Sequence, residues 1–393
     1  MGVIEQAIIL AGVRGTRLRP LTDRLPKPMA PVNGKPFLEY LVELLRQNGV
    51  QEIVLLLGYL PEKIRDHFGD GSRYGVKISY SVTRAEDETG ARLSAAAPLV
   101  RDTFLLLYGD NYWPLRLDPL FDFYQKKNTI ASVAVYTNKD RQSRNNMRVD
   151  EDGYVTVYDP LREVENLNGV EIGFFLLKKK VFSYMPGHNF SFEKEVLPVL
   201  IKERELAGFR TDHPYYSIGT MEKLERMRRA LRPKKVIFLD RDGIINKKPP
   251  PGEYVKSWNE FEFLPGAKRA LRMLAEKGYA MYIVTNQAGI GRGMMTHRDL
   301  DEIHARLAAE LEQEGVHLGG VYYCPHGWDE GCECRKPKSG MLYQAAREHD
   351  FDLTKTIFIG DDARDMEAGN GAGCLTFLTD ETRGVLEIAS ELA

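Results

Sequence analysis

Short apolar runs alternate with helical patterns along the whole chain, and this alternation constrains the fold more than any other feature. The runs Gln6–Leu10, Glu52–Leu57, Phe104–Tyr108 and Ser132–Tyr136 have the length of buried strands. Between the first two, residues 36–47 carry apolar side chains at positions 37, 38, 41, 44 and 45, the spacing of one helix face. This order predicts an α/β architecture of Rossmann-like domains with mainly parallel sheets.

The length of 393 residues predicts two domains, because it exceeds what one ordinary core accommodates. The basic stretch Met227–Lys235 ends a helical pattern and precedes a new apolar strand at Val236–Leu239. We therefore expect one domain over residues 1–232 and a second over residues 233–393. The second domain repeats the strand–helix–strand pattern at Tyr279–Val284, Asp299–Glu314 and Thr356–Ile359.

Composition and charge predict a cytoplasmic globular protein. The chain is 43% hydrophobic and 28% charged, and it has no run of about 18 apolar residues that would cross a bilayer. The N-terminal stretch lacks the basic region and the cleavage site of a signal peptide. A net charge of −2 supplies no general field for a polyanion, so neither a nucleic-acid nor a membrane partner is expected.

Polar residues follow three of the predicted C-terminal strands, the place where open α/β sheets bind ligands. Carboxylates follow the first and third strands, hydroxyl and amide donors end the second, and two cations lie in the loop between the second and third. In chain order they are Asp240 and Asp242, then Thr285, Asn286 and Gln287, then Arg335 and Lys336, and then Asp361 with Asp362. Carboxylates suit Mg²⁺, whereas the cations and the donors suit a phosphoryl group. One acidic strand end is commonly a cap or a turn, but four ordered elements indicate a phosphate-handling site.

This order of motifs resembles the haloacid dehalogenase superfamily over residues 235–393. The resemblance implies that Asp240 is a nucleophile that forms a phosphoaspartate. It implies that Asp242 protonates the leaving oxygen and then activates water. Thr285 and Lys336 would hold the phosphoryl oxygens, and magnesium would be bound by Asp240, the backbone carbonyl of Asp242, and Asp361.

Three of the four cysteines fall within a short stretch, which favours metal ligation in a reducing compartment. Cys324 and His326 are followed after five residues by Cys332 and Cys334. Thiolates with one imidazole form a closed tetrahedral set, so the spacing predicts a structural zinc site. The loop runs directly into the two cations of the phosphate site, and zinc would order them without taking part in the chemistry. The fourth cysteine, Cys374, is expected in the core.

The set LDRDG, TNQAG, CPH…CECRKP and SGML resembles the D,D-heptose 1,7-bisphosphate phosphatases. Glu253–Val255, Phe261–Gly266 and Lys338–Leu342 favour these enzymes. Histidinol-phosphate phosphatases have a similar zinc loop, including the short spacer, so both substrates stay open. Heptose phosphatases can carry Lys after the metal-binding Asp, whereas this chain has Asp362, which leaves the details of substrate contact open.

A second candidate phosphate site follows the first strand of the chain. Leu10–Leu18 (LAGVRGTRL) is a glycine-containing strand-to-helix turn, and Leu25–Met29 (LPKPM) comes shortly after it. Such turns let backbone amides approach phosphates, and nearby cations can meet the charge of a triphosphate. The candidate contacts are Gly12, Gly15, Thr16, Arg17 and Lys27. A later apolar strand ends in Tyr108-Gly109-Asp110.

These motifs resemble the sugar-1-phosphate nucleotidylyltransferases over roughly residues 1–232. The resemblance implies attack by a sugar 1-phosphate on the α-phosphorus of a nucleoside triphosphate, with release of pyrophosphate. Arg17 and Lys27 would stabilise the charge, and Asp110 would bind magnesium. Thr89–Ala91 and Ser191–Glu193 fall where the family places its substrate-binding segments, which makes Glu193 a candidate.

Two residues depart from the pattern of that family. Val13 replaces the second glycine of the loop, and a β-branched residue resists positive φ and crowds phosphates. Ser217 replaces an Asp that is the second metal ligand in the family, and a neutral hydroxyl is a poorer magnesium ligand.

Together the two resemblances predict a bifunctional enzyme of nucleotide-activated heptose synthesis. The C-terminal domain would remove the 7-phosphate of heptose 1,7-bisphosphate, and the N-terminal domain would couple heptose 1-phosphate to a nucleotide, with GTP favoured. In one alternative, the N-terminal domain is a degenerate binding or regulatory module. In another, both activities remain but the substrate is a different sugar phosphate or histidinol phosphate. The sequence fixes neither the base, the anomer nor the oligomeric state.

Overall fold

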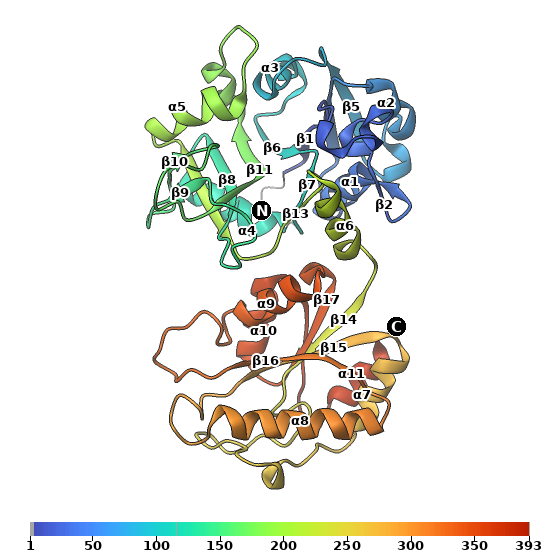
Figure 1. Ribbon diagram of the computed structural model, residues 1–393, viewed down its shortest axis with the longest axis vertical. Helices are drawn as coiled ribbons and strands as arrows, with labels where there is room; N and C mark the ends of the chain where they lie inside the picture. Colours follow the sequence, from blue (N-terminus) through green and yellow to red (C-terminus); the bar gives the residue numbers. More distant parts are fainter. Residues whose placement is uncertain (1–3, 115, 393) are drawn as a thin grey trace. The chain divides into compact units, whose positions relative to one another are not determined.

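The computed structural model describes residues 4–114 and 116–392 (Figure 1). The chain divides into two compact units, Met1–Leu231 and Arg232–Ala393. Among the described residues, none of the helices combines the length and apolar character that a membrane span requires.

Within its described residues, the first unit has a seven-stranded sheet in the order β12-β8-β11-β6-β1-β4-β5. These strands are β1 (Gln6–Leu10), β4 (Glu52–Leu57), β5 (Lys77–Val82), β6 (Thr103–Tyr108), β8 (Ala131–Tyr136), β11 (Val170–Lys178) and β12 (Leu206–Thr211). Neighbouring strands are parallel except that β11 is antiparallel to β6 and to β8. The sheet is therefore mixed. Residues 137–169 join β8 to β11 and contain no helix. Two consecutive parallel strands usually need a helix in the crossover between them, so β11 runs antiparallel to β8.

Three two-stranded ribbons complete the strands described in the first unit. They are β2 (Pro31–Val32) with β3 (Lys35–Pro36), β7 (Asn111–Tyr112) with β13 (Tyr216–Ser217), and β9 (Met147–Val149) with β10 (Val155–Tyr158).

Helices cover both faces of the seven-stranded sheet (Figure 1). They are α1 (Phe37–Gln47), α2 (Pro61–Phe68), α3 (Thr89–Ala95), α4 (Leu117–Lys127), α5 (Leu197–Lys202) and α6 (Met221–Ala230). Alternate residues of a strand point to opposite faces. Ala7 and Ile9 accordingly share a core with α1, α2, α4 and α6, whereas Ile8 and Leu10 pack with α3 and α5.

The second unit has a five-stranded, all-parallel sheet in the order β16-β15-β14-β17-β18. Its strands are β14 (Lys235–Leu239), β15 (Tyr279–Asn286), β16 (Leu318–Cys324), β17 (Thr356–Gly360) and β18 (Leu375–Leu378). Ile237 and Leu239 pack against α7 (Ala267–Glu276), α8 (His297–Gln313) and α11 (Val385–Glu391). Val236 and Phe238 pack on the other face against α9 (Gly340–His349) and α10 (Ala363–Ala372). Helix layers thus enclose the sheet, and its carboxyl edge is left for a site.

Candidate active sites

The C-terminal candidates gather at the carboxyl edge of the five-stranded sheet. Asp240 follows the central strand β14, Thr285 and Asn286 are the last residues of β15, and Asp361 follows β17. Because β14 is a parallel neighbour of both other strands, these ends share one edge. A cavity of about 310 Å³ opens there, lined among others by six predicted site residues: Asp240, Asp242, Thr285, Asn286, Arg335 and Lys336.

Asp240 is buried beside a lysine that holds two carboxylates. The Lys336 ammonium lies 2.9 Å from Asp240 Oδ1 and 2.6 Å from Asp365 Oδ1, and it donates to the Val284 carbonyl at 2.8 Å. Burial raises the pKa of Asp240 to about 7 against the lowering effect of Lys336, and the Asp365 and Asp242 carboxylates add to the rise. The carboxylate therefore needs nearby positive charge to act as a nucleophile.

Asp242 is held by three donors. Its carboxylate accepts from Arg241 Nη2 at 2.9 and 3.0 Å, from Asn246 Nδ2 at 2.8 Å and from Gln287 Nε2 at 2.9 Å. Burial alone would raise the pKa of Asp242, but the guanidinium and the two amides hold it below its ordinary value. Asp242 is thus an ionised acceptor in the free protein, the form that can take a proton from water.

Three carboxylates meet at a point that suits a hard cation. One oxygen each of Asp240, Asp361 and Asp365 lies within 4.8 Å of the others. Asp361 Oδ1 is buried and accepts no hydrogen bond within the described part of the chain. A Cβ on Gly243 would lie 2.1 Å from Asp361 Oδ2, so only glycine, here with a φ of 94°, allows this approach. The donor set fits Mg²⁺, which prefers carboxylate oxygens.

Asp362, the predicted departure, has a structural role. Its carboxylate caps the N-terminus of α10 and accepts from Arg364 Nε at 2.9 Å and from Arg364 Nη2 at 2.8 Å. These contacts hold the pKa of Asp362 well below its ordinary value. A cation is nevertheless present beside Asp361, because Lys248 Nζ lies 2.8 Å from Asp361 Oδ2 and lines the cavity.

Asn286 and Gln287 bind protein groups in this structure. Asn286 Nδ2 donates to the Lys336 carbonyl at 3.1 Å, and Asn286 Oδ1 accepts from the Lys336 amide at 3.1 Å. Gln287 Nε2 donates to Asp242 and, at 2.9 Å, to the hydroxyl of Thr285. Both amides therefore position groups that line the cavity.

The cysteine loop brings its four predicted ligands together. Sγ of Cys324 lies 3.6 Å from Sγ of Cys332 and 3.6 Å from Nδ1 of His326, which lies 3.1 Å from Sγ of Cys334. Tetrahedral zinc with bonds of about 2.3 Å to sulfur places neighbouring sulfurs about 3.8 Å apart. The four side chains can hold one metal ion, and the chain continues directly into Arg335.

The N-terminal loop forms a turn over buried cations. Gly15 has a φ of 73°, and a Cβ there would lie 2.7 Å from Cβ of Lys27. A Cβ on Gly12 would lie 2.6 Å from Nη1 of Arg92, a buried guanidinium that donates to the carbonyls of Leu57, at the end of β4, and of Ala85. Val13 has no positive φ, and its side chain is exposed, so the expected backbone conflict does not arise. Thr16 and Arg17 are exposed beyond the turn.

Asp110 lies across from the turn and is already paired. Lys27, which is buried, makes a short ion pair with its carboxylate. The pairing of β7 with β13 places Ser217 opposite Asn111, next to Asp110. Within the described residues, clusters of three or more possible metal ligands occur in the second unit, and none includes Asp110. Position 217 therefore offers a hydroxyl group and not a second carboxylate next to Asp110.

Glu193 lies in a network of hydroxyl groups. It accepts from Thr89 Oγ1 at 2.5 Å, from Tyr108 Oη at 2.6 Å and from Ser191 Oγ at 2.7 Å. Glu171, which was not predicted, lies close enough for the charge of Glu193 to act on it. Burial, followed by the Glu193 carboxylate, raises the pKa of Glu171 to about 8. The network joins the two segments that the sequence proposed for substrate binding.

The sequence reasoning missed three groups at these sites: Asp365, Lys248 and Glu171. Asp365 lies inside α10, and its signal is the capping-box spacing Asp362-x-x-Asp365. Lys248 lies in a proline-rich loop and Glu171 within a strand, and neither position carries a motif.

The first unit matches a known family over nearly its whole length. Residues 6–232 match the family model described as nucleotidyl transferase. The crystal structure of HddC from Yersinia pseudotuberculosis is 25% identical and superposes with a TM-score of 0.51, covering 58% of this chain and 100% of that one.

The second unit matches phosphatases. Residues 333–385 match the family model described as HAD-hydrolase-like. The D-glycero-beta-D-manno-heptose-1,7-bisphosphate 7-phosphatase of Pseudomonas aeruginosa is 36% identical over 159 residues, which are 40% of this chain and 88% of that protein. The D-glycero-alpha-D-manno-heptose-1,7-bisphosphate 7-phosphatase of Campylobacter jejuni is 40% identical over 151 residues, 38% of this chain and 85% of that protein.

Both predicted resemblances are confirmed. The chain belongs to the nucleotidyl transferase family, and its C-terminal unit belongs to the family of the D-glycero-D-manno-heptose-1,7-bisphosphate 7-phosphatases.

Proposed function

We propose that the C-terminal unit hydrolyses the 7-phosphate of D-glycero-D-manno-heptose 1,7-bisphosphate. The observation that carries this proposal is the buried Asp240 at the end of β14, held 2.9 Å from the Lys336 ammonium beside two further carboxylates. The two relatives described above support the heptose substrate over histidinol phosphate, because both are named for it. One is named for the β anomer and the other for the α anomer, so both anomers are candidate substrates.

The hydrolysis proceeds in two displacements on phosphorus. An Asp240 oxygen attacks, the bond from phosphorus to the sugar oxygen breaks, and Asp242 gives that oxygen a proton. Asp242 then takes a proton from water, the hydroxide attacks the phosphorus of the phosphoaspartate, the bond from phosphorus to the Asp240 oxygen breaks, and inorganic phosphate leaves. Asp242 acquires its first proton as the dianionic substrate enters, because a nearby negative charge raises the pKa of a carboxyl.

The cations of the site have separate roles in this proposal. Lys336 and Thr285 hold the phosphoryl oxygens, and Arg335 contacts the rest of the substrate. Magnesium held by Asp240, Asp361 and the carbonyl of Asp242, with the Asp365 carboxylate beside them, would supply positive charge to the phosphoryl group. Zinc on the cysteine loop would keep Arg335 and Lys336 in place.

We propose that the N-terminal unit transfers a nucleotidyl group to heptose 1-phosphate, with GTP as the donor. A phosphate oxygen of the sugar attacks the α-phosphorus, and pyrophosphate leaves. Gly12, Gly15 and Thr16 offer main-chain contacts to the phosphates, Arg17 and Lys27 meet their charge, and Glu193 faces the sugar. Family membership and the preserved turn support this function, and the product of the C-terminal unit is then the substrate of the N-terminal one.

The competing candidate for the N-terminal unit is a non-catalytic nucleotide-sugar binding module. The single carboxylate Asp110, paired with Lys27 and adjacent to Ser217, favours it.

One panel of reactions distinguishes these functions. The purified protein is incubated with magnesium and each anomer of heptose 1,7-bisphosphate or with histidinol phosphate, and phosphate release is measured. A second panel offers heptose 1-phosphate with each nucleoside triphosphate, and pyrophosphate is measured. We expect phosphate from a heptose bisphosphate and pyrophosphate with GTP. Preference for histidinol phosphate would reject the first proposal, and the absence of pyrophosphate with every nucleotide would favour the binding module.

A further inference from the structure

A lysine stands beside the position at which the N-terminal site lacks a carboxylate. Ser217 ends β13, and the next residue, Ile218, donates its amide to the Asp110 carbonyl at 2.9 Å. Two residues later Thr220 caps α6, and its hydroxyl accepts from the Lys223 amide at 3.3 Å. The main chain of Lys223 is thereby fixed in the first turn of the helix that follows Ser217.

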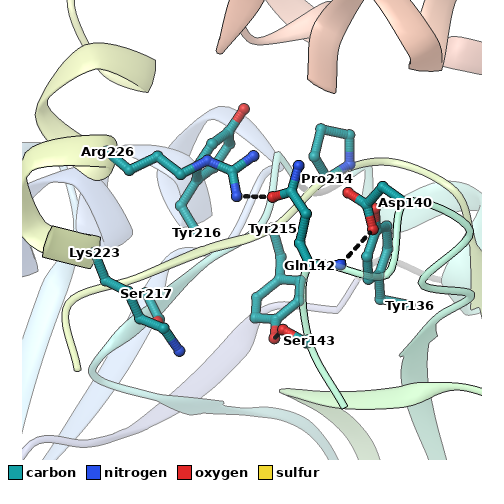
Figure 2. A pocket seen from close by; sticks show the side chains of 10 residues that line it. All are labelled: Tyr136, Asp140, Gln142, Ser143, Pro214, Tyr215, Tyr216, Ser217, Lys223 and Arg226. Carbon is teal, nitrogen blue, oxygen red and sulfur yellow. Dashed lines mark hydrogen bonds between the residues drawn. The ribbon is translucent and has the colours of Figure 1, made fainter. Parts of the chain in front are cut away.

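The side chains of Lys223, Ser217 and Arg17 converge around Gly219. A Cβ placed on Gly219 would lie 4.0 Å from Cδ of Lys223, 3.9 Å from Oγ of Ser217 and 3.9 Å from Nη2 of Arg17. Lys223 and Ser217 also line one pocket, and Figure 2 shows them together at one side of it, away from the contact between Arg226 and Gln142. The arrangement brings a lysine, an arginine and a hydroxyl to one place.

The charge around Lys223 is unbalanced. Its ammonium makes no hydrogen bond or ion pair with any residue that the structure describes. Partial burial lowers its pKa, the positive charges of Arg17, Arg162 and Lys27 lower it further, and Asp110 opposes them. Lys27 already occupies the carboxylate of Asp110. Cations gathered in this way are stabilised by a bound polyanion, and the N-terminus of α6 adds a favourable dipole.

We propose that Lys223 binds the phosphates of the nucleoside triphosphate. Its positive charge takes the place of the charge of a metal ion, which a carboxylate at position 217 would bind. The inference rests on the proposed nucleotidyl transfer for its substrate. A carboxylate in place of Ser217 would lie near the lysine and would form an ion pair with it. In this proposal, lysine and arginine side chains supply the positive charge that a metal ion would supply in a site with a carboxylate at position 217.

Binding of GTP without metal tests this directly. Calorimetry with GTP in excess EDTA is compared for the wild type, Lys223→Ala, Lys223→Gln and the control Lys126→Ala, an exposed lysine of α4. We expect the two Lys223 variants to bind about tenfold more weakly, as for loss of one charged hydrogen bond. The control should bind as the wild type does, and phosphate release by the other unit checks each preparation. Unchanged binding in both Lys223 variants, or no binding of GTP by the wild type, overturns the proposal.

A double-mutant cycle then links Lys223 to position 217. The magnesium concentration for half-maximal pyrophosphate release is measured for Ser217→Asp, Lys223→Ala and the double variant. We expect Lys223→Ala to raise this magnesium concentration several-fold and Ser217→Asp alone to change it little. The double variant should need less magnesium than Lys223→Ala does. Additive effects of the two substitutions contradict the proposal. If the wild type releases no pyrophosphate while metal-free binding still depends on Lys223, the transferase function fails and the binding role of Lys223 stands.

Discussion

Asp240 owes its proposed role to its surroundings more than to its position at a strand end. It is buried, and the Lys336 ammonium that faces it is shared with Asp365. Asp240→Asn keeps the shape of the side chain but cannot act as the nucleophile. We expect phosphate release to fall by several orders of magnitude, as when a covalent nucleophile is removed, with folding retained. The exposed Asp301 of α8 provides the matched control Asp301→Asn. Turnover near that of the wild type in Asp240→Asn would exclude the assignment.

Glu171 gives the first unit a pH-dependent stability. The unfolded chain ionises this carboxyl near its ordinary pKa of 4.5, whereas the folded protein keeps it protonated up to about 8. As the pH rises from 4.5 to about 8, the unfolded chain therefore loses this proton while the folded protein keeps it. The free energy of unfolding of the first unit falls over this pH range. Glu171→Gln removes the ionisation, so we expect the melting temperature of the first unit to rise by a few degrees at pH 8.5 and by less at pH 5.5.

Calorimetry of Glu171→Gln at the two pH values checks this prediction, with the exposed Glu163→Gln as control. A gain that is equal at both pH values would show that the carboxyl does not titrate as described.

Among the single residues, the sequence predicted those that reach a site because they lie at the end of a strand. Asp240, Thr285 and Asp361 lie at the ends of adjacent parallel strands, so a correct strand order places them together. Asp365 and Glu171 could not be found in this way, because their proximity depends on how a helix and a reversed strand pack. The contacts of Asn286 with Lys336 likewise depend on the path of the cysteine loop.

We propose that the cysteine loop depends on a bound zinc ion for its order. Its four ligand atoms lie within 4.8 Å of one another, and the loop leads into Arg335 and Lys336. We expect about one zinc per chain. Chelation should raise the KM for the bisphosphate several-fold before the second unit unfolds, because most of the core between the sheet and its helices lies outside the loop, which contributes Cys324 and the partly buried Cys332 and Cys334.

Elemental analysis and kinetics during titration with a chelator check this prediction, and added zinc should restore the KM. Protein purified without chelators that contains no zinc, or a KM that is insensitive to chelation, would contradict it.

The elements themselves were largely predictable, and the exception has a physical reason. β1 and β4 have the predicted bounds, and α1 begins one residue after Pro36. The direction of β11 was not predictable from its apolar run, because periodicity gives the faces of a strand but not its orientation. That orientation follows from a connection without a crossover helix.

For the whole molecule, the central claim is that one chain carries two sites that act in sequence on the same sugar. Each unit has its own sheet, core and site, so a substitution in one should leave the other active. Lys27→Ala should therefore stop nucleotidyl transfer but not phosphate release, and Asp240→Asn should do the reverse.

The most direct test follows heptose 1,7-bisphosphate through the full chain by mass spectrometry, in the presence of GTP and magnesium. The account predicts that the wild type forms a GDP-heptose with release of phosphate and pyrophosphate, and that Lys27→Ala accumulates heptose 1-phosphate. Asp240→Asn should leave the bisphosphate intact yet form the GDP-heptose when heptose 1-phosphate is supplied. Accumulation of heptose 1-phosphate by the wild type, with no nucleotide sugar from any nucleoside triphosphate, would contradict the account.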